Sequence, residues 1–158
     1  MYSSKIKNYL NFSINDNCVA NKLLHKLEIT KTRLYIILNS IYIFEKFKCN
    51  NNMYVDKYLL FTTCIILSSK LFMDISYTNQ SWTEIFPFDC KQISSLELTI
   101  LEKLDYKIYL PFKNMELLYF EYGKKEDIDW LIANNIPTKK KKDMFFIFKK
   151  FLKCIKII

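Results

Sequence analysis

Glycine and proline, the residues that most often interrupt regular structure, are almost absent from this chain. Gly123 is the single glycine among 158 residues, and the three prolines, Pro87, Pro111 and Pro137, all follow residue 86. Phosphate-binding loops, dinucleotide-binding turns and two-residue β-hairpins usually need glycine, because glycine tolerates positive φ angles and a close approach of the backbone. The sequence therefore argues against nucleotide-binding enzymes and against most β architectures.

Five helices are predicted between residues 14 and 110, separated by turns rich in asparagine and serine. The predicted segments are 14–27, 30–47, 54–73, 79–85 and 89–104. Two of them begin with cap signals: Thr78 or Asn79 can cap the fourth helix, and Asp89 with Gln92 forms a capping-box pattern before the fifth. Hydrophobic residues make up 51% of the chain, so the helices have enough apolar surface for an all-α domain.

The third of these segments, Tyr54 to Met73, is the most apolar part of the chain. Ten consecutive residues, Tyr58 to Leu67, leave almost no polar face. A breaker-free stretch of this length exceeds an ordinary strand, whereas its strongly apolar part is too short to span a membrane. We therefore expect a helix that is buried on most sides and forms the centre of the core.

The chain beyond Pro111 predicts further helices. Residues 113–122 and 126–134 match two short helices around Gly123, and residues 143–158 form an amphipathic pattern. Its apolar face carries Met144, Phe148, Phe151, Ile155 and Ile158, and its basic face carries Lys149, Lys153 and Lys156. We assign residues 1–13 to an N-terminal extension, 14–110 to the five-helix domain and 111–158 to a C-terminal helical extension.

Charge and cysteine content suggest an intracellular protein. The net charge is +8, and residues 138–158 alone carry eight lysines against Asp143, so the excess belongs to the C-terminal tail. Because Arg33 is the single arginine, nucleic-acid recognition is a secondary possibility.

The five cysteines are widely spaced and predict free thiols, with no disulfide-linked partner. Residues 1–16 lack the apolar stretch of a signal peptide, so we expect the cytoplasm, the nucleus or both.

A local match now adds to this pattern. The ten residues from Lys70 to Asn79, KLFMDISYTN, followed by Trp82, resemble the cyclin box, and in particular that of the phosphate-regulation (P-type) cyclins. The resemblance covers about residues 14–110. Further matching pieces are Lys26-Leu27, Phe44-Glu45-Lys46-Phe47, Ser68-Ser69-Lys70, Leu96-Glu97, Leu101, Leu104-Asp105-Tyr106 and Ile108.

The chain also departs from the P-type pattern. Phe86-Pro87 stands where a glycine pair is usual, and Gln92 and Ser94 replace a glutamate and an asparagine of the family's fifth helix. The 48 residues after position 110 are too few for a second cyclin repeat, and the Met-Arg-x-x-Leu substrate-docking motif is missing. The resemblance therefore implies a five-helix, single-box cyclin with additional C-terminal helices.

This resemblance implies a function without catalysis. A cyclin binds and activates a cyclin-dependent protein kinase, and Lys70 and Glu97 match the pair at the centre of the kinase contact. From the sequence alone, Lys70 would be read as a solvated lysine that complements the helix dipole. No enzyme is expected: His25 has no identifiable nucleophile, and Glu97 and Glu102 lie on different faces of one helix. We expect no cofactor, no metal site and no small-molecule substrate.

An alternative interpretation is a cyclin-fold adaptor that binds a kinase or the transcription machinery without activating it, while its basic tail contacts membrane or nucleic acid. The run Lys139 to Lys142 is usually a solvated surface feature. However, four cations at the start of a helix oppose its dipole, which hints at a partner. A nuclear import receptor or an anionic lipid would fit such a run.

Overall fold

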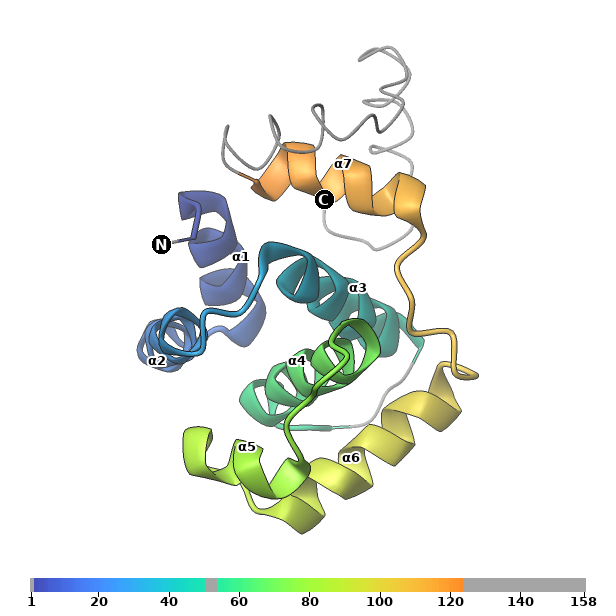
Figure 1. Ribbon diagram of the computed structural model, residues 1–158. Coiled ribbons are helices and arrows are strands. Elements are labelled where there is room, and N and C mark those ends of the chain that lie inside the picture. The colour runs from blue at the N-terminus through green and yellow to red at the C-terminus, as the bar shows by residue number, and fades with distance from the viewer. Residues whose placement is uncertain (1, 51–53, 124–158) are drawn as a thin grey trace.

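The computed structural model describes residues 2–50 and 54–123, and in this part of the chain it is all α-helical, without a strand. The helices are α1 Ser4–Ile14, α2 Asn17–Ile29, α3 Leu34–Asn50, α4 Lys57–Phe72, α5 Asn79–Ile85, α6 Cys90–Lys103 and α7 Phe112–Tyr122 (Figure 1). The prediction of an all-α fold is confirmed for these residues. The helices predicted at 126–134 and 143–158 lie outside them, as does the lysine run at 139–142.

Helix α4 is the central helix, as its sequence predicted. All ten side chains from Leu60 to Ser69 are buried. The helix packs mainly against α3 and α6, and the rings of Phe44 and Phe61 meet edge to face with centroids 5.2 Å apart. Asp56 begins the helix by accepting a hydrogen bond from the backbone N–H of Leu59. Most of the stabilisation of α4 thus comes from apolar burial on several sides.

Helix α1 was not predicted from the sequence. Ser3 caps it by accepting from the backbone N–H of Ile6, and Ile6 and Leu10 are fully buried. The helix ends at Asn15, which takes the left-handed conformation, and Asp16 then caps α2. This two-residue link folds α1 back onto α2, so that the N-terminal segment contributes to the core. Helix α2 begins at Asn17, three residues later than the predicted segment.

Local cap signals in the sequence set where α5 and α6 begin. The Thr78 hydroxyl accepts from the backbone N–H of Ser81 and caps α5. Asp89 and Gln92 form the predicted capping box at the start of α6. After α6 the chain turns through two left-handed residues and continues to α7, which crosses close to α3 and α1 (Figure 1). No helix in the described ranges has the length and apolarity to cross a membrane.

Candidate functional site

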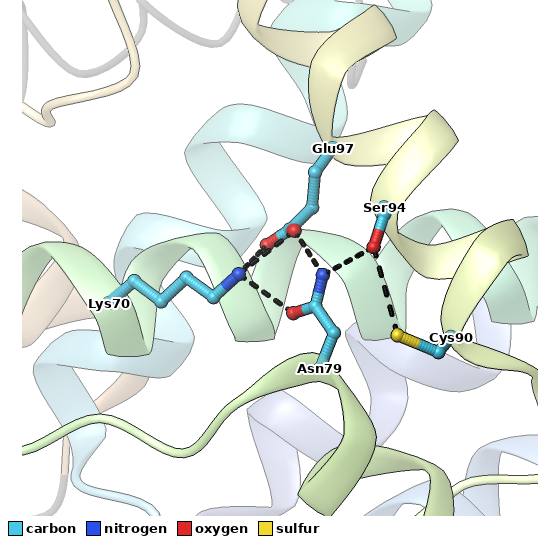
Figure 2. Close-up of polar contacts among 5 residues, drawn as sticks. All are labelled: Lys70, Asn79, Cys90, Ser94 and Glu97. Atoms are coloured by element: carbon cyan, nitrogen blue, oxygen red, sulfur yellow. Dashed lines mark hydrogen bonds and ion pairs between the residues drawn. The ribbon is translucent and has the colours of Figure 1, made fainter.

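A polar cluster on the surface of the domain joins the end of α4, the start of α5 and the first half of α6. Lys70 lies in the last turn of α4, Asn79 is the first residue of α5, and Ser94 and Glu97 lie one turn apart on α6. Figure 2 shows the four side chains converging, although they come from three separate segments of the sequence. The short loop between α4 and α5 allows this, because it brings the start of α5 beside the end of α4.

The cluster is held by hydrogen bonds of normal or short length. The Lys70 ammonium donates to both carboxylate oxygens of Glu97, at 2.7 and 2.9 Å, and to Asn79 Oδ1 at 2.7 Å. Asn79 Nδ2 donates to Glu97 Oε2 at 2.6 Å and to Ser94 Oγ at 2.9 Å. The Cys90 sulfur lies 3.9 Å from Ser94 Oγ, at the edge of the cluster (Figure 2). Charge-assisted contacts of this kind are the stronger hydrogen bonds in proteins.

The two charged groups differ in their exposure. The Glu97 side chain is 10% exposed, whereas the Lys70 side chain is 35% exposed. A carboxylate buried to this extent needs a charged or hydrogen-bonding partner, and Lys70 and Asn79 supply it. In the free chain, all three ammonium N–H groups and both amide N–H groups have acceptors within the cluster. The cluster is therefore a surface group of polar side chains whose donors and acceptors satisfy one another in the free chain.

Exposed apolar side chains flank the cluster in the sequence. Leu71 follows Lys70 and Leu98 follows Glu97, and both are exposed, the latter at 52%. Beyond Leu71, the loop to α5 presents Met73, and Ile75 at 88% exposure. Single exposed apolar residues are ordinary on the surface of a monomer. Here four of them follow the charged pair closely in the sequence.

A groove opens next to this surface. Its cavity volume is about 360 Å³, and it lies between residues 30–33 and the segment that follows α4. Met73, Ile75 and Tyr77 line one part of it, and Lys31 and Arg33 line another. The buried indole of Trp82 also borders it. The groove is therefore lined by apolar, basic and hydroxyl side chains together.

A second polar pair lies inside the domain. The Tyr9 hydroxyl on α1 donates to Glu45 Oε1 on α3, and Lys48 lies 3.5 Å from the same oxygen. Burial raises the pKa of Tyr9 well above its ordinary value, and the negative charge of Glu45 raises it further. Because both Tyr9 and Glu45 are buried, this pair ties α1 to α3 and offers little to a partner.

The sequence identified only part of the surface cluster. Lys70 and Glu97 were selected together, and they form an ion pair. Asn79 entered as a possible helix cap and as the last residue of the matched segment, with no role at the site, and Ser94 entered as a departure from the P-type pattern. The signal that could have found Asn79 is its position in the segment KLFMDISYTN, where Thr78 already supplies a cap and leaves the amide available.

The other residues weighed for chemistry do not converge. His25 is exposed on α2, and Glu102 is exposed on α6. Across residues 2–50 and 54–123, no three histidine, cysteine, aspartate or glutamate side chains gather where a metal ion could be held. Comparison of the chain with protein-family models, with curated proteins and with solved structures found no match.

Proposed function

We propose that this chain is a cyclin-like regulatory subunit that binds a cyclin-dependent protein serine/threonine kinase and activates it. The observation that carries the proposal is the Lys70–Glu97 pair. These two residues match the centre of the kinase contact in the cyclin-box resemblance, and their charged atoms lie 2.7 Å apart on α4 and α6. The residues that follow them in the sequence, Leu71 and Leu98, are exposed and apolar, which also favours a protein partner.

The proposed role requires no chemistry from this chain. The kinase supplies ATP binding and catalysis, and the α4 and α6 faces hold its regulatory helix inward, which completes the kinase's own lysine–glutamate pair. Shifting a kinase from mostly inactive to mostly active requires about 5 kcal/mol of differential binding. An interface of ordinary size, about 1,600 Å², can supply that free energy.

Lys70 and Glu97 are already paired in the free chain, so substituting either one can affect folding as well as binding. Removing the Lys70 side chain leaves the Glu97 carboxylate, which is mostly buried, with only its Asn79 donor. Removing the Glu97 side chain leaves the half-exposed Lys70 ammonium, which water can solvate. We therefore expect Lys70→Ala to lower the free energy of unfolding more than Glu97→Ala does. Folding and binding must be measured separately.

The experiment uses the full-length chain and the kinase identified by affinity purification with it. Lys70→Ala and Glu97→Ala each remove one member of a hydrogen-bonded pair, which typically costs about 2–5 kcal/mol in an interface. The Kd should rise at least tenfold, mainly through faster dissociation. The matched control is Lys57→Ala, which removes an exposed lysine at the other end of α4, about 20 Å from Lys70.

Circular dichroism and the melting temperature show which variants remain folded. The proposal fails if folded Lys70→Ala and Glu97→Ala bind and activate the kinase as well as Lys57→Ala does. Kinase binding that depends on both residues, without any increase in kinase activity, would instead favour an adaptor that binds but does not activate.

A further inference from the structure

We propose that Asn79 is a positioning residue of this site: its carboxamide holds the Lys70 ammonium and the Glu97 carboxylate in the one geometry that a partner meets. The inference rests on the proposed function, because the partner is taken to be the kinase. The inference adds Asn79 to the site as a residue that affects kinase binding by orienting Lys70 and Glu97.

The charges around Asn79 fix the orientation of its amide. Its oxygen faces the Lys70 ammonium at 2.7 Å, and its nitrogen faces Glu97 Oε2 at 2.6 Å. Rotating the amide by half a turn would place an N–H group against a cation and an oxygen against a carboxylate. Both of those contacts are repulsive, so the cluster has a single arrangement that satisfies every group.

The location of Asn79 leaves its side chain available for this role. It is the first residue of α5, but the cap of that helix is the Thr78 hydroxyl, which accepts from the backbone N–H of Ser81 at 3.2 Å. The Asn79 amide is therefore not needed to begin the helix. It reaches away from α5 toward α4 and α6 (Figure 2).

Positioning matters most for Lys70. A lysine side chain has many rotamers, and ordering it during association opposes binding. Asn79 and Glu97 together fix its ammonium before a partner arrives, so less freedom is lost on binding. A neutral amide suits this position, because a carboxylate would repel Glu97 and an ammonium would repel Lys70.

A purely structural role is the competing explanation. Asn79 also donates to Ser94 Oγ at 2.9 Å and thereby attaches α5 to α6. Ser94→Ala removes this attachment but keeps both bonds from Asn79 to the charged pair. If attachment of α5 were the important effect, Ser94→Ala would lower kinase affinity as much as Asn79→Ala does. If Asn79 acts by positioning the charged pair, Ser94→Ala should lower kinase affinity clearly less.

The experiment compares Asn79→Ala, Asn79→Asp and Ser94→Ala with Gln80→Ala, which truncates a neighbouring, exposed amide on α5. Asn79→Ala should weaken kinase binding about tenfold, the usual effect of losing a hydrogen bond to a charged group. Asn79→Asp should bind at least as weakly, because it keeps an acceptor for Lys70 but repels Glu97. Gln80→Ala should bind like the unmodified chain.

A second readout needs no kinase. In the free, folded chain, the ¹⁵Nζ relaxation of Lys70 should report an ordered ammonium, and Asn79→Ala should make it clearly more mobile, although less mobile than the ammonium of exposed Lys57 because both bonds to Glu97 remain. The inference is overturned if Lys70 stays equally ordered in Asn79→Ala, or if that variant binds the kinase normally while Lys70→Ala does not. If Lys70→Ala and Glu97→Ala also bind normally, the proposed function fails, and the relaxation result alone decides whether Asn79 positions Lys70.

Discussion

Two buried glutamates are held by different sets of partners. Glu45 and Glu97 both lie on helices and both are buried. Glu45 is bonded by Tyr9 from inside the domain, whereas Glu97 is bonded by Lys70 and Asn79 at the surface. The two carboxylates therefore differ in their partners: Tyr9 and Lys48 hold Glu45, whereas Lys70 and Asn79 hold Glu97. The sequence could not show this difference, because it depends on where α1 and α5 pack.

The internal pair predicts a measurable effect on stability. Tyr9→Phe removes the hydroxyl that donates to Glu45 and leaves a buried carboxylate without that partner. The free energy of unfolding at neutral pH should fall by about 1–3 kcal/mol, measured by urea titration. Tyr54→Phe, at a fully exposed tyrosine, serves as the control and should change little. Equal stabilities of the two variants would contradict a structural role for the pair.

The same variant should alter the dependence of stability on pH. The pKa of Tyr9 is raised by burial and then by Glu45, so the folded protein holds this proton more tightly than the unfolded chain does. The resulting stabilisation is complete below the unfolded pKa of about 10 and is lost as the pH rises toward the folded pKa. Above pH 10, Tyr9→Phe should therefore lose stability less steeply than the unmodified chain. Burial also raises the pKa values of Tyr2 and Tyr122 to about 12. These two residues should therefore still make stability fall with rising pH, both in the unmodified chain and in Tyr9→Phe.

Among the elements, those with local signals were predicted well. The centre of α4 follows from its apolar run. The cap of α5 is Thr78, one of the two residues expected there, and the cap of α6 is Asp89, as expected. Thr30 and Thr32 were both possible caps of α3, which begins at Leu34; Thr30 instead ends α2, because its hydroxyl donates to carbonyl groups of that helix. Lys70 and Glu97 came from the family resemblance. Asn79 and Ser94 were missed because their contacts depend on how three helices converge.

Helix α1 escaped prediction because its stability comes from tertiary packing. Asn8 and Asn11 interrupt its apolar pattern, and a helix this short is marginal in isolation. Its buried face packs against the rest of the domain, and Ser3 donates to the backbone oxygen of Tyr122 on α7. Residues 4–14 are therefore expected to fold and unfold together with the domain.

Two substitutions on α1 test this expectation. Leu10 is fully buried, so Leu10→Ala should lower the free energy of unfolding by about 2–5 kcal/mol. Phe12 lies on the same helix but is 78% exposed, so Phe12→Ala should have little effect. Thermal unfolding followed by circular dichroism measures both. If the two variants melted at the same temperature, α1 would be an appendage with no share in the cooperative core.

At the scale of the whole molecule, the charge is unevenly distributed. Residues 1–110 carry 13 basic and 10 acidic side chains, whereas residues 138–158 carry eight lysines and one aspartate. The proposed kinase surface contains a self-neutralised pair, so its binding should depend only modestly on salt. Binding of the tail to an anionic surface would be steeply salt-dependent. The two kinds of association can therefore be separated in one chain.

The last prediction concerns the lysine run. Changing Lys139, Lys140, Lys141 and Lys142 together to glutamine lowers the net charge from +8 to +4. Each lysine near an anionic membrane contributes about 1 kcal/mol, so binding to phosphatidylserine vesicles should fall about a thousandfold, while kinase affinity should stay the same. The control changes four exposed lysines of the helical domain, Lys7, Lys22, Lys57 and Lys91, and produces the same net charge. Vesicle sedimentation measures both. Equal losses in the two variants would mean that total charge, rather than the lysine run, governs attraction to the membrane.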